Sequence, residues 1–385
     1  KVYLDYAATT PLDPEVFEAM KSYYLEKYAN PASLHWMGQE AALAVKEARE
    51  FLASAINTSS EELIFTSSAT ESNNLALKGL AWANKSKRKR IIVSAVEHDC
   101  VLNTARWLAK QGYQVDYLEV DQYGMINLKR LKEILAQDVL LVSVIHANNE
   151  IGTIQPIKKI ATLCHQVGAV FHIDASQTFG KMPLDVEEFG VDLLTTSAHK
   201  IYGPKGVSFL YCKKGVKLSP LLHGGGQELN LRSSTSNVPG IVGFAKAIEI
   251  ALKNQEQESQ KIKKLRDKLQ QKILNSTPNC YLNGHPDHRL YNILNVRLDY
   301  IEGESLVMSL SQKGVAASTG SACSSPKLEP SHVLLATGLK PAQAHGSLRL
   351  SLGRWTTLEE VNYAADTLKQ VVDRLRNISP FKIQQ

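Results

Sequence analysis

Three apolar runs, each of which ends in polar side chains, most strongly constrain what this chain can fold into. They are LLVSVIHANNEIG (140–152), AVFHIDASQ (169–177) and DLLTTSAHK (192–200). Nearly continuous aliphatic and β-branched runs are typical of parallel strands that are buried on both faces. Because ligands of open α/β sheets bind just outside the carboxyl ends of such strands, we expect the polar residues that follow them to share one site.

Length and composition indicate a large globular protein without a nucleic-acid or membrane role. The chain has 385 residues, of which 44% are hydrophobic and 21% charged, and a modest formal charge of +6. The dense basic run at 85–90 is interpreted as a solvated loop that leads into a strand, with a nucleic-acid patch or docking site as the alternative. No apolar stretch approaches the ~20 residues that span a bilayer, and we expect no signal peptide.

The cysteines favour a reducing compartment. They lie at positions 100, 164, 212, 280 and 323, an odd number without a C-x-x-C pair. This pattern argues against a disulfide framework and against a zinc site, so we expect no resident metal and a cytoplasmic location, with an organelle left open. Cys100 and Cys164 lie beside apolar runs and are expected to pack as buried apolar residues.

The order of elements predicts an α/β fold with two domains. Strands and helices alternate from about residue 62 to 212 at a spacing typical of a parallel sheet with helices on both faces. We further expect helices from Asp13-Pro14 onward and over 38–55, 251–274, 303–314 and 357–378, and strands over 290–298 and 346–353. The predicted division is a large domain at 15–258 and a small α+β domain formed by 1–14 and 259–385.

Asp174 and Lys200, at the ends of two of the runs, suggest pyridoxal phosphate as a cofactor. The lysine can hold the aldehyde as a Schiff base, and the carboxylate can keep the pyridine nitrogen protonated. Taken alone, a strand-end lysine is more often a surface charge, and Asp174 is equally well a helix N-cap. Their pairing favours the cofactor. Ser197 and His199 can then bind the phosphate, and Gln177 can donate to the ring oxygen.

Two further segments of the large domain fit the same site. His98 follows the apolar run 91–96 and is either a core histidine or an imidazole that stacks on the cofactor ring and moves protons. Residues 67–71 precede a predicted helix, whose N–H groups and dipole suit a phosphate. A capping box between Ser68 and Glu71 is compatible with that role.

The small domain contributes a thiol and a guanidinium group. Cys323 lies in the Gly- and Ser-rich segment 317–326, which is typical of an exposed loop in which a thiol can act as a nucleophile. Arg349 alternates with leucines in its strand and is expected to face away from the apolar side. There it binds a substrate carboxylate or forms a surface salt bridge.

Segments throughout the chain resemble those of the pyridoxal-phosphate-dependent cysteine desulfurases of the NifS/IscS type, in the class-V aminotransferase family. The matching segments are LDYAATTPLDPEV (4–16), NPASLH (30–35), SATESNNLALKG (68–79), EHDCV (97–101), HANNEIGTIQPI (146–157), HIDASQTFGK (172–181), SAHKIYGPKG (197–206), GGGQE (224–228), GSACSS (320–325), LEPSHVL (328–334) and SLRLSLGR (347–354). The resemblance implies a fold-type-I architecture with a mostly parallel seven-stranded sheet. The chain departs from the family pattern at Ser68 and Ser234, where glycine is usual, and at Pro326-Lys327.

The resemblance also implies roles for individual residues. Lys200 would hold the cofactor, Asp174 would pair with the ring nitrogen, Gln177 would contact the ring oxygen, and His98 would stack on the ring. Ala69, Thr70, Ser197 and His199 would bind the phosphate, with Thr235 added from a second subunit. Asn149, in contact with the cofactor, and Arg349 would orient the substrate, and Cys323 would be the nucleophile.

The implied reaction converts L-cysteine to L-alanine and leaves sulfur on Cys323 as a persulfide. The implied partners are a second copy of the chain and an iron–sulfur scaffold or other sulfur acceptor, with Cys323 available as a transient iron–sulfur ligand. Three alternatives remain open on the same fold: an aminotransferase, a cysteine C–S lyase and a non-catalytic assembly platform. The first needs a keto acid, the second releases pyruvate and sulfide, and the third lacks turnover.

Overall fold

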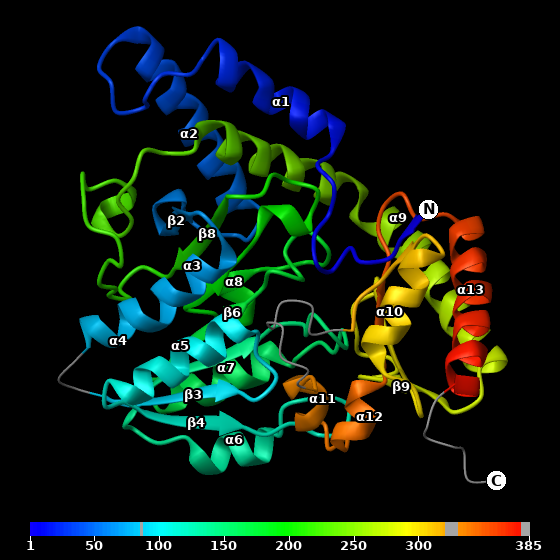
Figure 1. The fold of residues 1–385 in the computed structure, drawn as a ribbon. Coiled ribbons are helices and arrows are strands. Elements are labelled where there is room, and N and C mark those ends of the chain that lie inside the picture. The colour runs from blue at the N-terminus through cyan, green and yellow to red at the C-terminus, as the bar shows by residue number, and fades with distance from the viewer. Residues whose placement is uncertain (85–87, 320–329, 379–385) are drawn as a thin grey trace.

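A seven-stranded sheet forms the centre of the larger part of the computed structural model, which describes residues 1–84, 88–319 and 330–378 (Figure 1). In spatial order its strands are β2 (Leu63–Thr66), β8 (Ser208–Cys212), β7 (Leu193–Thr195), β6 (Val170–Asp174), β5 (Val139–Ile145), β3 (Arg90–Ser94) and β4 (Gln114–Leu118). All neighbouring pairs are parallel except those that include β8. The predicted α/β fold with a mostly parallel seven-stranded sheet is confirmed.

Helices cover both faces of this sheet, as the apolar runs predicted. Within β3, Ile91 and Val93 pack into one hydrophobic cluster and Ile92 into another, because successive side chains of a strand point to opposite faces. One face is covered by α1 (Pro14–Leu25), α2 (Trp36–Ser54), α6 (Leu128–Ile134), α7 (Ile157–Gln166), α8 (Val186–Phe189) and part of α9 (Val238–Ser276). The other is covered by α5 (Asp99–Lys110) and by the continuous helical segment α3 (Ala69–Asn74), η2 (Leu75–Gly79) and α4 (Leu80–Ala83).

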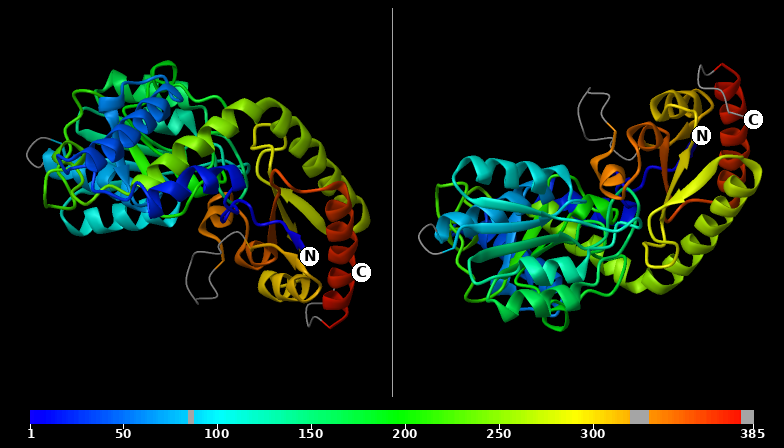
Figure 2. Two further views of the ribbon diagram at one scale, coloured as in Figure 1. Left: turned by 90° about the horizontal axis from the view of Figure 1, so that it is seen from above. Right: turned by 90° about the horizontal axis from the view of Figure 1, so that it is seen from below.

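The smaller part of the molecule lies at the far end of α9 (Figure 2). A three-stranded antiparallel sheet has the order β12 (Ser347–Ser351), β10 (Ile293–Leu298) and β9 (Cys280–Asn283), and β1 (Val2–Tyr3) pairs in parallel with β11 (Val315–Ala316). The helices here are α10 (Gly303–Gln312), α11 (His332–Ala336), α12 (Pro341–His345) and α13 (Leu358–Ile378). Short 3₁₀ turns elsewhere in the chain are η1 (Ser60–Glu62), η3 (Ala198–Lys200) and η4 (Glu228–Asn230).

The long helix α9 contributes to two separate hydrophobic cores. Its first half packs against the large sheet through residues such as Phe244, whereas Ile262 and Leu269 pack with Val2 and Leu4 of the N-terminal segment. The proposed boundaries at 15–258 and at 1–14 with 259–385 remain a prediction, which this distribution of core residues supports. In the described part of the chain, no helix is long and apolar enough to cross a membrane.

Candidate active site

A cavity of about 260 Å³ lies at the carboxyl edge of the large sheet, where the three apolar runs end. The cavity wall contains many of the residues that the sequence singled out: Ala69, Thr70, His98, Asn149, Asp174, Gln177, Ser197, His199, Lys200 and Arg349. Thr235 is exposed and is not among the residues that line this cavity. Cys323 lies outside the described residues.

Asp174, the last residue of β6, is held in place by hydrogen bonds to both carboxyl oxygens. Its side chain is almost fully buried, with 4% of the residue exposed. Oδ2 accepts a bond of 2.7 Å from Nδ2 of Asn73, and Oδ1 accepts bonds of 2.9 and 2.6 Å from the backbone N–H and the hydroxyl of Ser176. Donors on both oxygens stabilise the charged carboxylate, which suits a partner for a protonated ring nitrogen.

Lys200 and Gln177 converge on the same backbone oxygen of the N-terminal segment. Lys200 ends the short turn η3, and its Nζ donates to the carbonyl oxygens of Ala7 and Ala8 at 2.7 and 2.6 Å. Gln177 Nε2 donates to the Ala7 oxygen at 2.9 Å. The run 192–200 forms a strand only over Leu193–Thr195, and the following turn brings the lysine amine into the cavity.

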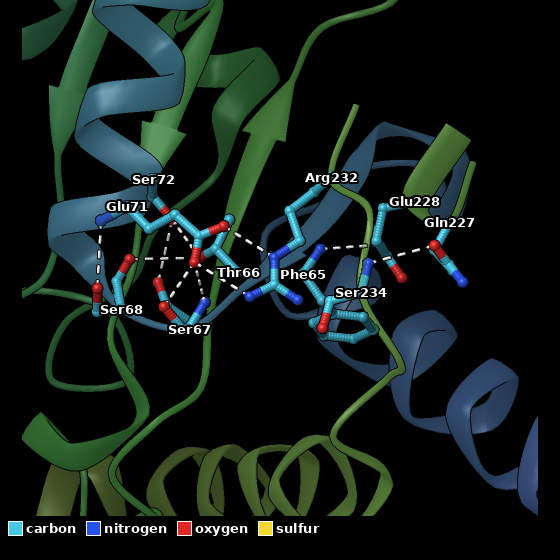
Figure 3. A network of polar contacts seen from close by, with 11 residues as sticks. Phe65, Thr66, Ser67, Ser68, Glu71, Ser72, Gln227, Glu228, Arg232 and Ser234 are labelled. Atoms are coloured by element: carbon cyan, nitrogen blue, oxygen red, sulfur yellow. Dashed lines mark hydrogen bonds and ion pairs between the residues drawn. The ribbon is translucent and has the colours of Figure 1, made fainter. Parts of the chain in front are cut away.

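The turn before α3 is braced by Glu71 (Figure 3). Ser68 is the N-cap of the helix, and its hydroxyl accepts from the Glu71 N–H at 3.2 Å. The predicted capping box is only half formed, because the Glu71 carboxylate does not accept a hydrogen bond from the Ser68 N–H. It accepts from the N–H and hydroxyl of Ser67 and forms an ion pair with Arg232 at 2.8 Å. Burial opposes the charge on Glu71, but the bonds from Arg232 and Ser67 outweigh it and lower the pKa of the carboxyl.

Two of the three histidines that line the cavity were expected from the sequence. Burial, followed by the charge of Lys200, lowers the pKa of His199 to about 4, so the ring is neutral at pH 7. Its Nδ1 lies 3.0 Å from the Thr9 hydroxyl. His98 is the N-cap of α5, and its Nδ1 accepts from the backbone N–H of Cys100 at 3.2 Å. The prediction that Cys100 packs as a buried apolar residue is wrong: it is half-buried and lines the cavity, because the first turn of α5 faces this space.

Arg349 reaches the cavity from β12. Only 3% of the residue is exposed, and the guanidinium donates to the Asn149 carbonyl oxygen at 2.9 Å and to Asp5 Oδ1 at 2.8 Å. The expected surface salt bridge is therefore a buried one. Nε of Arg349 is buried and has no hydrogen-bond partner among the described residues, which leaves a donor for a substrate carboxylate.

The wall also contains ionisable side chains that were not identified from the sequence, among them Glu97, Glu150 and His332. Glu97 is fully buried, and neither of its carboxyl oxygens makes a well-formed hydrogen bond among the described residues. Burial and then the charge of Asp174 raise its pKa well above the usual range. Glu150 accepts from the Ser331 hydroxyl at 2.5 Å, and His332 Nε2 lies 2.8 Å from the Glu97 backbone oxygen. The available signals were the positions of Glu97 beside His98 and of Glu150 beside Asn149, and for His332 the matching segment 328–334.

The donor set of the cavity fits pyridoxal phosphate. A buried carboxylate with satisfied oxygens suits a pyridinium N–H, and an amine that donates to the backbone carbonyls of Ala7 and Ala8 suits an aldehyde. The start of a helical segment and the side chains of Ser197 and His199 lie in the same wall, as a phosphate needs. These residues could hold the cofactor without rearrangement of the sheet.

Thr235 lies in a separate loop that is fixed to the edge of the large sheet. Glu228, in the turn η4, accepts from the Phe65 N–H at 2.8 Å and pairs with Arg49 at 2.6 Å, and Arg232 pairs with Glu71 (Figure 3). The loop is thus anchored at Glu228 and Arg232, whereas Thr235, three residues further on, is exposed. Its expected contact with the phosphate of a second subunit remains a prediction.

Comparisons with known proteins give a consistent assignment over nearly the whole chain. Residues 2–363 match the family model described as aminotransferase class-V. A protein of Dictyoglomus turgidum named cysteine desulfurase IscS is 50% identical over 382 residues, which cover 99% of this chain and 97% of the relative.

Two solved structures are also similar. One, titled NIFS-LIKE PROTEIN, has a TM-score of 0.92 and 40% identity, and the match covers 97% of this chain and all of that chain. The other, SspA in complex with cysteine, has a TM-score of 0.82 and 37% identity, covering 93% of this chain and all of that chain.

Proposed function

Because the chain belongs to the class-V aminotransferase family, we propose that it is a pyridoxal-phosphate-dependent cysteine desulfurase. It converts L-cysteine to L-alanine, with transfer of sulfur to Cys323 as a persulfide. The observation that carries the proposal is the convergence of Lys200, Asp174 and Arg349 on one cavity, in a chain that is 50% identical to a protein named cysteine desulfurase.

Pyridoxal phosphate, when bound, supplies an aldehyde for amino groups and a ring that accepts an electron pair from the substrate Cα. In the proposal, Lys200 binds the cofactor and, once released, removes and returns the Cα proton. Asp174 accepts a hydrogen bond from the ring nitrogen and holds it protonated. Gln177 contacts the ring oxygen, and His98 lies against the ring face.

The remaining assignments concern the phosphate, the substrate and the sulfur. Ala69, Thr70, Ser197 and His199 bind the phosphate, with Thr235 added from the partner subunit. Arg349 binds the substrate carboxylate through its unpartnered Nε, beside Asn149. The Cys323 thiolate attacks the substrate sulfur: an S–S bond forms, the Cβ–S bond breaks, and its electron pair is left on carbon, which takes up a proton to give alanine.

The proposal extends to partners and location. We propose a homodimer that passes the persulfide sulfur to an iron–sulfur scaffold or to an acceptor in thio-cofactor biosynthesis, with Cys323 as a transient iron–sulfur ligand. Cys100, Cys164, Cys212 and Cys280 are free thiols. This supports a reducing compartment such as the cytoplasm.

A single-turnover reaction with L-cysteine in the absence of reductant tests the activity. We expect one alanine per site, and intact-mass analysis should show a gain of one sulfur atom that maps to Cys323. The Cys323→Ala variant should lose the adduct. Cys280→Ala, which removes a thiol of the small sheet away from the cavity, should keep it.

Other products would contradict the proposal in distinct ways. Pyruvate and sulfide without an adduct would indicate a lyase, and a requirement for a keto acid would indicate an aminotransferase. Bound cofactor without any product from cysteine would indicate a different substrate or an assembly platform. An adduct that persists in Cys323→Ala would refute the assignment of the nucleophile alone.

A further inference from the structure

A second buried lysine lies directly behind the proposed cofactor lysine. Lys181 follows β6 by seven positions, and only 8% of the residue is exposed. Its Nζ donates to Oε1 of Gln177 at 3.1 Å. The other end of that amide, Nε2, donates to the Ala7 oxygen, which also accepts from Lys200 Nζ. One amide and one carbonyl therefore connect the two amines.

The two lysines also share an internal cavity. It has a volume of about 20 Å³, enough for about one water molecule, and both Lys181 and Lys200 line it. Gln255 Nε2 and Asn292 Oδ1, in the same wall, are buried without a hydrogen-bond partner among the described residues. Residues of α9 and of the segment that follows β12 line this space, and both amines are partly or fully buried there, so charges on them are screened less than in water.

The charged neighbours do not neutralise Lys181. The other titratable side chains around this cavity are Tyr6, Tyr202, Glu258, Tyr291 and Arg354, with His199 adjoining on η3. Glu258 already pairs with Arg354 at 2.7 Å, and Arg354 pairs with Asp13 at 2.5 Å. Lys181 itself forms no ion pair with any described residue. Burial, and then the charge of Lys200, lowers the pKa of Lys181 to about 7.

Charge repulsion between two buried amines acts in both directions. A positive charge on either lysine makes a positive charge on the other less favourable. An amine attacks an aldehyde and accepts a proton only when it is uncharged, and a neighbouring cation is one known means of keeping a lysine in that form. The Gln177 amide adds a second effect, because Lys181 occupies its oxygen and thereby directs its Nε2 toward Ala7.

We propose that Lys181 is a positioning residue that competes with Lys200 for a single positive charge, so that Lys200 gives up its charge more readily, and whose hydrogen bond orients the Gln177 amide. This inference rests on the proposed function, in that Lys200 is taken as the lysine that binds the cofactor. The inference gives Lys181 a role at that site. Neither the sequence motifs nor the lining of the 260 Å³ cavity had indicated one.

The test uses the cofactor-free protein and follows the rate at which it forms a covalent adduct with added pyridoxal phosphate, by absorbance, as a function of pH. Because only the uncharged amine reacts, the midpoint of this profile reports the pKa of Lys200. We expect Lys181→Met to move the midpoint upward by about one pH unit or more, and so to slow the reaction about tenfold on the acidic side.

Two further variants separate charge from packing. Lys181→Arg carries a permanent charge, has the small cavity into which to extend, and should leave the midpoint at or below that of the wild type. Lys205→Met removes an exposed lysine five positions from Lys200 and should change nothing. An unchanged midpoint in Lys181→Met would overturn the inference. So would equal shifts in the Met and Arg variants, because these would indicate lost packing.

A measurement on the wild-type protein covers the case in which Lys181→Met does not fold. With ¹³C-labelled lysine, the side-chain resonance of Lys181 in the cofactor-free protein should titrate, and its midpoint should change once the Lys200 amine is consumed in the covalent adduct. A midpoint that does not respond would overturn the inference. Adduct formation by Lys200→Ala, in contrast, would contradict the proposed function itself.

Discussion

At the scale of single residues, the position of the Asp174 carboxylate depends on donors from two separate segments of the chain. Its Oδ2 accepts from Asn73, a residue of α3 that is fully buried although it is polar. The same Nδ2 lies 3.1 Å from the Cys100 sulfur. Asn73 therefore connects the helix that begins at the proposed phosphate site to the carboxylate at the other end of the cofactor.

Asn73→Ala is expected to destabilise the cofactor-free protein by about 1–3 kcal/mol, because a buried carboxylate oxygen loses its partner. The affinity for pyridoxal phosphate should also fall, since Asp174 loses a donor that holds its carboxylate in place. Urea unfolding and a cofactor titration measure the two effects. Asn103→Ala, which removes an exposed asparagine on α5, is the control, and equal results for both variants would contradict the role of Asn73.

At the scale of elements, Glu71 joins the turn before α3 to the loop that carries Thr235. Its carboxylate accepts from Ser67 on one side and from Arg232 on the other (Figure 3). Since Thr235 lies three residues after Arg232, the ion pair fixes the base of the segment that we propose to reach the partner subunit. This arrangement explains why the carboxylate is not used to cap its own helix at Ser68.

Glu71→Gln is expected to cost about 1 kcal/mol of stability at pH 7, because a hydrogen-bonded charge is lost from a pair that is not fully enclosed. The folded-state pKa of Glu71 is lowered, so its contribution is present above the unfolded pKa of about 4.5 and is lost as the pH falls below it. Urea unfolding over this range should therefore show the difference between wild type and variant shrinking in acid.

The exposed Glu18, which forms only a surface pair with Lys21, supplies the control as Glu18→Gln. It should have little effect on stability at any pH. If the difference in unfolding free energy between wild type and Glu71→Gln stays constant as the pH falls, the charge of Glu71 does not stabilise the protein through its ion pair with Arg232.

At the scale of the whole molecule, apolar side chains are exposed over α1, α2 and the segment that joins them. The exposed residues there are Phe17, Tyr24, Leu25, Tyr28, Leu34, Trp36, Leu43 and Phe51, and Leu34 reaches 92%. Large exposed apolar groups that lie close together are typical of surfaces that bind another protein. A second copy of the chain would cover them, in agreement with the proposed homodimer.

Leu34→Lys is expected to raise the dimer dissociation constant about tenfold or more, because two added charges would have to be buried in each dimer. Sedimentation at several protein concentrations measures this shift. Met308→Lys, which places the same charge at an exposed apolar residue of α10, should leave the association unchanged. A wild-type protein that is monomeric at micromolar concentration would contradict the homodimer.

Local patterns were enough to predict the elements that carry the site. The apolar runs that end at Asp174 and Lys200 became strands of a buried parallel sheet, because side chains buried on both faces leave few alternatives to that structure. The N-cap at Asp13 and the closing helix Leu358–Ile378 likewise depend on neighbours in the sequence. The assignment of the family rested on motifs spread along the chain, each of which was visible without a structure.

Contacts between distant segments, in contrast, were decided only by the tertiary structure. Arg349 was ambiguous in the sequence because its partner Asp5 lies at the other end of the chain, and only the joining of both ends in one core turns a surface charge into a buried pair. The role proposed for Lys181 has the same origin. Its charge matters because folding removes water and brings Lys200 to the same cavity, and no local pattern encodes that loss of solvent.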